Sequence, residues 1–219
     1  MADKDNLPVV VIGLGRFGSS LALELTRLGA EVLAIDHRPK VVQSLAGEIT
    51  QIVTADSTDL QALHQLGVPD FQRAVVAIGS DIEASILTTS LLVELEINDI
   101  WAKAISRQHG RILERIGATH VVLPEHDMGE RVAHLVSGRM LDYVQIDPGF
   151  VMVKTHPPRE LVGVPLGETR MRRKYGVTIV CVKSKGEDYT YATPDTVLQY
   201  GDLILVVGPI SKVERFTDL

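Results

Sequence analysis

The chain contains a single cysteine, Cys181, among its 219 residues, which excludes a disulfide bond within the chain. It has no apolar run near the length of about 20 residues that a helix needs to cross a bilayer. Its first residues, MADKDNLP, include acidic residues and a proline where a signal peptide has a basic start and an apolar core. We therefore expect a cytoplasmic protein.

An excess of positive charge is also absent. The 22 Lys and Arg residues are outnumbered by 28 Asp and Glu residues, which gives a formal net charge of −6 at pH 7. Nucleic acids and anionic membranes attract basic surfaces, so this charge favours no nucleic-acid partner. The densest basic cluster, RMRRK, lies in the segment ETRMRRKYG at 168–176, which we expect to form one helix with a solvated face.

Short apolar segments alternate with amphipathic segments over roughly the first 123 residues. The apolar segments are LPVVVIG, EVLAID, TQIVTAD, RAVVAIG, DIWAKAI and THVVLP, and the segments between them have helical periodicity. Such alternation is typical of parallel strands joined by helices that cover both faces of the sheet. The sequence therefore predicts an α/β fold with a Rossmann-type, doubly wound sheet of six parallel strands.

The pattern changes after Pro124. EHDMGERVAHLVSGRML predicts one longer crossover helix, and the short strands YVQIDP, FVMVKTHP, VTIVCVKS and DLILVVG follow, separated by turn-forming residues. We expect an N-terminal nucleotide-binding domain over residues 1–140, which includes the crossover helix, and a small C-terminal α+β domain over residues 141–219.

Three glycines form a GxGxxG motif directly after the first predicted strand and before the first predicted helix. Gly13 permits a tight turn, Gly15 lets the backbone approach a phosphate, and Gly18 lets the helix pack on the strand. The helix start favours an anion. Asp36 ends the second predicted strand, where an acid accepts hydrogen bonds from ribose hydroxyls, so the sequence predicts a nucleotide site.

Polar residues also follow the third and fourth predicted strands. Asp56, Ser57 and Thr58 come after the third strand, at the sheet edge where a base would lie, and VAIGSD at 76–81 follows the fourth. Asp56 and Asp81 also fit the alternative interpretation of helix caps. Arg16 is informative because the glycine loop of a dinucleotide dehydrogenase usually binds a pyrophosphate through backbone groups alone. A cation in this loop can contact an additional negative charge or another subunit.

The sequence offers no catalytic arrangement. A dehydrogenase needs an acid or base that faces the nicotinamide, usually from a substantial second domain, and only about eighty residues remain for one. The 7 histidines show no metal-ligand spacing apart from His126 and His134, which are two helical turns apart. We expect a protein that is not an enzyme; a small NAD(H)-dependent oxidoreductase or redox sensor is the alternative, because the same pocket accepts NAD.

Several blocks of sequence carry a family resemblance: IGLGRFGSSLALEL at 12–25, VLAID at 32–36, VAIGSDIEASILTTSLLVELEI at 76–97, WAKA at 101–104, LERIGATHVVLPEHDMG at 113–129 and RRKYGVTIV at 172–180. The chain resembles the cytosolic regulatory subunits of bacterial potassium uptake systems, the KtrA/TrkA type built from RCK domains (regulator of conductance of potassium). It is nearer to KtrA than to two-copy TrkA chains.

The resemblance implies a set of nucleotide-binding residues: Gly13, Gly15, Arg16, Phe17 and Gly18 at the phosphates, Asp36 at the ribose, Asp56, Ser57 and Thr58 near adenine, Ala77, Ile78 and Gly79 on the pocket floor, and Lys103 near the phosphates. Apart from the resemblance, we expect His37, which follows Asp36, to line the edge of the nucleotide site. Arg16 would reach the terminal phosphate of ATP bound in the neighbouring subunit. Glu125 would hold Mg²⁺ or Ca²⁺ between the phosphates, because hard cations prefer oxygen ligands; without the family it reads equally well as a helix N-terminal acid.

The resemblance also implies partners. Homodimers would assemble into an octameric ring on a membrane potassium-translocating subunit of the KtrB/TrkH type, peripheral on the inner face of the cell membrane. ATP and ADP would set the ring conformation. Cyclic di-AMP is a further ligand of the C-terminal domain in relatives, although Arg170 and Arg173 flank Arg172 here, where relatives often have an acid and a small residue.

Overall fold

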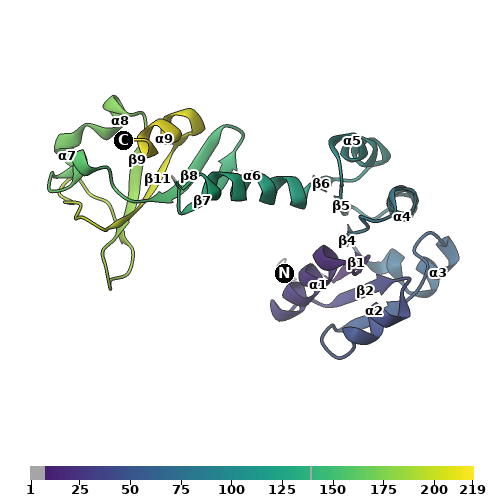
Figure 1. Ribbon diagram of the computed structural model, residues 1–219. Helices are drawn as coiled ribbons and strands as arrows, with labels where there is room; N and C mark the ends of the chain where they lie inside the picture. The colour runs from purple at the N-terminus through teal and green to yellow at the C-terminus, as the bar shows by residue number, and fades with distance from the viewer. Residues whose placement is uncertain (1–7, 139) are drawn as a thin grey trace, which may run out of the picture. The chain divides into compact units, whose positions relative to one another are not determined.

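The computed structural model describes residues 8–138 and 140–219. It contains two compact units, one ending at His126 and the other beginning at Asp127 (Figure 1). Helix α6 (Pro124–Val136) contains the point of division. The predicted domain boundary at 140/141 stays a prediction. Among the described residues, no helix combines the length and the apolar character that crossing a membrane requires.

A six-stranded parallel sheet forms the first unit, in the order β3-β2-β1-β4-β5-β6. Its strands are β1 (Val9–Ile12), β2 (Val32–Asp36), β3 (Gln51–Thr54), β4 (Arg73–Val76), β5 (Asp99–Lys103) and β6 (His120–Val122). The helices between them are α1 (Arg16–Arg27), α2 (Pro39–Ser44), α3 (Leu60–Gln65), the short 3-10 helix η1 (Val68–Asp70), α4 (Ile82–Glu94) and α5 (Arg107–Ile116). The prediction of a six-stranded, doubly wound Rossmann-type sheet is confirmed.

Strand β1 shows why an uninterrupted apolar run becomes the centre of this sheet. All four of its residues are buried, because helices cover both faces. The pleat sends Val9 and Val11 into the apolar layer that includes Ala22 of α1. Val10 and Ile12 enter the opposite layer, which includes Leu92 of α4. The order of strands reverses at β1, between β2 and β4, which opens a crevice at the carboxyl ends of the strands.

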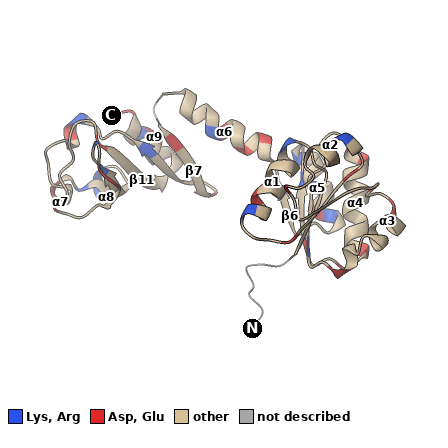
Figure 2. Cartoon of the chain, turned by 90° about the horizontal axis from the view of Figure 1, so that it is seen from below, with Lys and Arg blue, Asp and Glu red and all other residues tan. Residues whose placement is uncertain are grey.

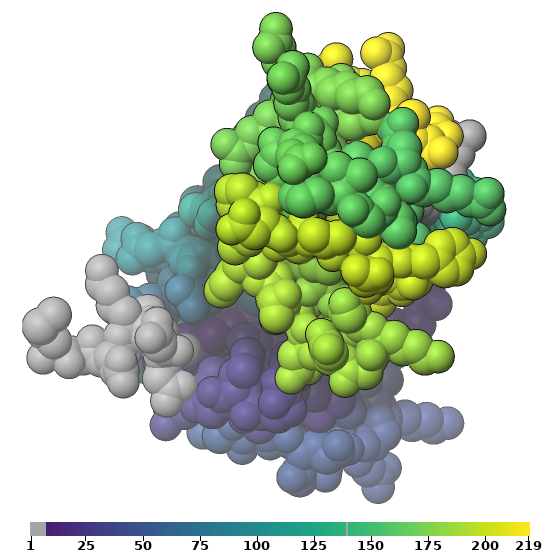
Figure 3. Space-filling model, turned by 90° about the vertical axis from the view of Figure 1, so that its left-hand side faces the viewer, coloured from purple at the N-terminus to yellow at the C-terminus, as the bar shows by residue number. Residues whose placement is uncertain are grey.

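The second unit is built on a five-stranded antiparallel sheet in the order β10-β9-β11-β8-β7. Its strands are β7 (Asp142–Asp147), β8 (Phe150–Thr155), β9 (Thr178–Lys183), β10 (Thr190–Tyr191) and β11 (Leu203–Pro209). Its remaining elements are η2 (Arg159–Leu161), α7 (Leu166–Thr169), α8 (Met171–Lys174) and α9 (Ile210–Thr217). Phe216 of α9 joins Val153 and Ile204 in a buried core. This confirms the small C-terminal α+β domain, one face of which is shown by the green to yellow atoms in Figure 3.

The expectation of a single helix over ETRMRRKYG is wrong. Arg170 adopts a left-handed conformation, with φ +51° and ψ +39°, and separates α7 from α8. The reversal buries Met171 in the core while Arg172 and Arg173 stay exposed. Lys and Arg are interspersed with Asp and Glu along the elements of both units (Figure 2).

Candidate nucleotide-binding site

A cavity of about 730 Å³ lies in the first unit at the carboxyl ends of the parallel strands. It is bordered by residues that follow β1, β2, β3, β4 and β5, so it occupies the crevice where the strand order reverses. The predicted site residues that line it are Gly13, Gly15, Arg16, Phe17, Asp36, His37, Asp56, Ser57, Thr58, Ala77, Ile78, Gly79, Lys103 and Glu125. The structure therefore brings these residues together, while their binding of a ligand stays a prediction.

Gly18 is the one predicted site residue outside this lining. A Cβ atom at Gly18 would stand 1.9 Å from the backbone oxygen of Gly13 and 2.9 Å from the Ala77 Cβ. Gly18 is thus needed for the close packing of α1 against the strands, and it does not face the cavity.

The other two glycines of the motif differ in their surroundings. Gly13 has a φ of +92°, and an added Cβ would lie 3.0 Å from Ile78 Cγ1, so both conformation and space require glycine there. A Cβ at Gly15 would meet nothing within 4 Å. Helix α1 begins directly after Gly15, with Arg16, Phe17 and Gly18 in its first turn. An anion over Gly15 would therefore meet backbone N–H groups and the positive end of the helix dipole.

Asp36 ends β2 and has an almost fully buried side chain. Its Oδ2 accepts hydrogen bonds from Leu14 N (2.7 Å) and Arg38 Nη2 (2.9 Å), and its Oδ1 accepts from Arg38 N (2.8 Å) and Arg38 Nε (2.9 Å). Burial acts to raise the pKa of this carboxyl, but the hydrogen bonds from Arg38 and Leu14 outweigh it and lower the pKa to about 2. Asp36 is therefore a firmly ionised acceptor.

The loop after β3 is held by its own hydrogen bonds. Asp56 Oδ1 accepts from Thr58 N (2.9 Å) and Thr58 Oγ1 (2.7 Å), and these bonds lower the pKa of the Asp56 carboxyl. Ser57 Oγ lies 2.9 Å from Thr88 Oγ1 of α4, which fixes the loop against that helix. Asp56 forms a turn and does not cap a helix, because Asp59 is the N-cap of α3.

The helix-cap interpretation does hold for Asp81. Its Oδ1 accepts a hydrogen bond of 3.0 Å from Ala84 N at the start of α4. Asp81 also lines the cavity, so capping and exposure to a ligand coexist.

Lys103 and Glu125 form an ion pair on another part of the lining. Lys103 ends β5 and is buried, and its Nζ donates to Glu125 Oε1 at 2.6 Å. This hydrogen bond is the main cause of a lowered pKa for the Glu125 carboxyl, and the charge of Arg16 lowers that pKa further. The Lys103 Nζ also lies 5.7 Å from the centre of the Phe17 ring. Cationic groups and one exposed carboxylate thus gather beside the glycine turn.

Sequence reasoning missed several lining residues, and Arg38 is the one that changes the chemistry. A cation two positions after the strand-end acid was a readable signal, because such a spacing allows a local ion pair. The other missed residues, which had no motif to mark them, are Ile12, Ile35, Glu83, Ala84, Leu87 and Ile105.

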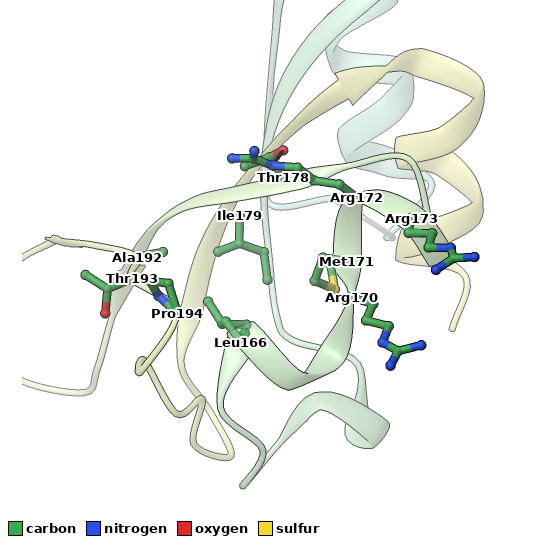
Figure 4. A pocket seen from close by; sticks show the side chains of 11 residues that line it. Leu166, Arg170, Met171, Arg172, Arg173, Thr178, Ile179, Ala192, Thr193 and Pro194 are labelled. Atoms are coloured by element: carbon green, nitrogen blue, oxygen red, sulfur yellow. Dashed lines mark hydrogen bonds between the residues drawn. The ribbon is translucent and has the colours of Figure 1, made fainter.

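The second unit has a cavity of its own, of about 570 Å³, beside α7 and α8. Leu166, Met171 and Ile179 are among its apolar lining residues (Figure 4). Arg172 extends toward Thr178 and donates through Nε to Thr178 Oγ1 at 3.2 Å, whereas Arg170 and Arg173 point to the opposite side. Of the three arginines, Arg172 is therefore the one directed toward Thr178.

Comparison with known proteins supplies the family. The TrkA-N domain model matches residues 9–124, and the TrkA-C domain model matches residues 150–219. Ktr system potassium uptake protein A of Bacillus subtilis is 37% identical over 212 residues, which cover 96% of each chain. Protein C of the same system is 39% identical over 94% of each chain, and protein A of Vibrio alginolyticus is 36% identical over 93% of each.

Solved structures support the fold. The GsuK RCK domain superposes with a TM-score of 0.66 at 19% identity, covering all of this chain and 48% of the other. The NAD(P)-binding domain of an exopolyphosphatase-related protein from Archaeoglobus fulgidus superposes with a TM-score of 0.53 at 25% identity, covering 61% of this chain and 99% of that one. The chain spans nearly the full length of the Ktr proteins and about half of the GsuK chain. It belongs to the family of TrkA-N and TrkA-C domain proteins that includes the Ktr system potassium uptake proteins.

Proposed function

We propose that this chain is a nucleotide-sensing regulatory subunit of a potassium uptake system, acting in the cytoplasm on a membrane subunit that conducts the ion. The names of three relatives at 36–39% identity support potassium uptake as the process. The observation that carries nucleotide sensing is the cavity itself, which combines the open Gly15 turn, the ionised Asp36 and a cationic end. The proposed role is regulatory, not enzymatic.

The chemistry beside the glycine turn favours a ligand whose phosphate number matters. Arg16 is exposed at the start of α1, where it is free to approach a terminal phosphate of its own ligand or of one in a second copy. ATP and ADP differ by one phosphate, and a ligand shifts a conformational equilibrium only by its difference in affinity for the two states. ATP would therefore stabilise one conformation of a homodimer, within an octameric ring, and ADP would not stabilise that conformation.

A divalent cation fits the phosphate end as a shared ligand. Among the residues that the structure describes, no three His, Cys, Asp or Glu side chains gather into a metal site. Glu125 supplies a single exposed carboxylate, so phosphate oxygens and water would complete the coordination of Mg²⁺ or Ca²⁺. The cation would neutralise phosphate charge, while this chain's own groups orient the nucleotide.

The cavity beside α7 and α8 is the place for a second nucleotide ligand. Its volume of about 570 Å³ and its apolar lining suit a small molecule, and Arg172 adds a donor for phosphate. Cyclic di-AMP is the proposed ligand.

A dinucleotide is the second candidate for the first cavity. Asp36 accepts ribose hydroxyls from NAD(H) as well as from ATP, and the Archaeoglobus fulgidus neighbour at 25% identity is described as an NAD(P)-binding domain. In that case the chain would sense redox state through the same cavity.

Calorimetric titration of the purified protein with ATP, ADP, NADH and cyclic di-AMP, each with and without Mg²⁺ or Ca²⁺, tests these assignments. We expect ATP and ADP to bind, and Gly15→Asp to abolish both, because the new carboxylate would fill the open space above the turn and repel phosphate. Ser20→Asp adds the same charge to an exposed position of α1 outside the cavity and should bind normally. Tight NADH binding without ATP or ADP binding would overturn the ATP assignment.

The role of Arg16 has its own test. Arg16→Ala should reduce the preference for ATP over ADP and leave ADP affinity largely intact, because only the terminal phosphate loses a partner. Solution scattering with each nucleotide should report two shapes of the assembly for the wild type. Equal losses of ATP and ADP affinity would contradict the assignment of Arg16 to the terminal phosphate.

A further inference from the structure

Every acceptor position of the Asp36 carboxylate is filled in the structure. A carboxylate has about four lone-pair positions, two on each oxygen. Two of them accept backbone N–H groups, from Leu14 and Arg38, and the other two accept Nε and Nη2 of the Arg38 guanidinium. A ribose that approaches Asp36 therefore finds the acceptor it needs already occupied.

Of these partners, the Arg38 guanidinium is the one that can move away from Asp36. The Arg38 side chain is 47% exposed, whereas the Asp36 side chain is 2% exposed. Rotation of the arginine side chain into solvent would leave both backbone hydrogen bonds in place, so the carboxylate would keep its position. The two acceptor positions freed in this way lie one on each oxygen, which is the arrangement that two vicinal hydroxyls match.

We propose that Arg38 is a specificity-determining residue that competes with the ligand for Asp36, so that a ligand must carry a vicinal diol to replace both guanidinium hydrogen bonds. This inference rests on the proposed nucleotide-binding function. A ligand that lacks the diol leaves the Asp36–Arg38 pair intact and gains nothing from Asp36. A ligand with the diol exchanges its two hydroxyls for the guanidinium, and the buried carboxylate stays fully hydrogen-bonded throughout.

This competition predicts that loss of the Arg38 side chain raises the affinity for the nucleotide, which is the opposite of what charge attraction alone predicts. Removing a cation from the lining of an anion-binding cavity would ordinarily weaken binding. Here the Arg38→Ala variant should bind adenine nucleotides more tightly, because the carboxylate is then open in every molecule. If about one wild-type molecule in ten has the pair open, apparent affinity rises about tenfold in the variant.

The test is a cycle of two proteins and two ligands, measured by calorimetry without added metal. ADP should bind Arg38→Ala about tenfold more tightly than the wild type, while 2′,3′-dideoxy-ADP should bind both proteins equally. Arg27→Ala is the matched control, because Arg27 forms a similar two-bond pair with Glu24 on α1, outside the cavity. It should leave both affinities unchanged. Thermal unfolding of each variant checks that it is folded.

The outcomes separate the inference from the function on which it rests. Weaker or unchanged ADP binding by Arg38→Ala, or an equal gain for the dideoxy ligand, would overturn the role of Arg38 and leave nucleotide binding standing. If folded wild type and variant bind neither ADP nor NADH, the proposed function fails and the inference fails with it. Because NADH carries the same adenosine ribose, a gain with NADH also supports the role of Arg38.

Discussion

Acid should remove a defined part of the stability of the first unit, because Asp36 must accept a proton as the pH falls. Its pKa is lowered from 3.8 to about 2 in the folded protein. The unfolded chain therefore takes up the proton first, so the stability that this carboxylate contributes is complete above about pH 4 and is lost as the pH falls to about 2. One unit of pKa corresponds to about 1.4 kcal/mol, so the full loss is about 2 kcal/mol.

The protein offers a built-in reporter for this measurement. Trp101 is the only tryptophan in the sequence, and it lies on β5 of the first unit, stacked on His120. Urea unfolding followed by tryptophan fluorescence at a series of pH values therefore gives the unfolding free energy of that unit. Asp36→Asn removes the titrating group, so the difference in unfolding free energy between wild type and variant should shrink by about 2 kcal/mol between about pH 5 and pH 2.

A second variant checks the cause of the low pKa. Arg38→Ala removes two of the four hydrogen bonds to Asp36 and its charge partner, so the pKa of the folded-state carboxyl should rise. The acid-induced loss should still begin near about pH 4, where the unfolded chain takes up the proton, but it should be smaller and should be complete at a higher pH than in the wild type. A difference between wild type and Asp36→Asn that stays constant with pH would refute the reasoning.

Three further changes test individual features. Gly18→Ala should destabilise the first unit by about 2 kcal/mol or more, because its Cβ would stand 1.9 Å from the Gly13 oxygen, whereas Gly15→Ala should change stability by less than about 1 kcal/mol; equal urea midpoints would contradict this. Arg170→Gly should stabilise the second unit by up to about 1 kcal/mol by relieving a left-handed conformation, and a lower Tm would show that its side chain contributes more. Lys103→Met should raise the pKa of the Glu125 carboxyl, measurable by carbon NMR, and an unchanged pKa would count against the pair.

The parallel sheet was readable from the sequence because its signal is local. A run such as VVVI, apolar at every position, fits a strand that is covered on both faces, and the structure buries all four residues. The ends of such strands are equally visible, and parallel strands bring their carboxyl ends to one edge. Asp36 and Asp56 were therefore placed near one cavity without any knowledge of side-chain contacts, whereas Lys103 was placed there only by the family resemblance.

The details that escaped the sequence depend on contacts between distant residues. A local reading favours one helix over ETRMRRKYG, but burial of Met171 in the second core accompanies a left-handed Arg170. Helix α9 was missed although Ile210, Val213 and Phe216 have the three-residue spacing of an apolar helix face. Strand β11, which directly precedes α9, is strongly apolar, so the apolar residues of the helix were not distinguished from those of the strand.

Two carboxylates of the cavity lining, Asp36 and Glu125, are each bonded to a cation of this same chain, Arg38 and Lys103 respectively. A nucleotide carries a replacement for each bond, because its ribose hydroxyls donate to a carboxylate and its phosphates accept from a lysine. Binding would then exchange partners and would bury no unpaired charge. Release of Glu125 from Lys103 would in turn require phosphate, so we expect affinity for a divalent cation to rise when ATP is bound. A cavity organised in this way would respond to the number of phosphates, because the second exchange would depend on them.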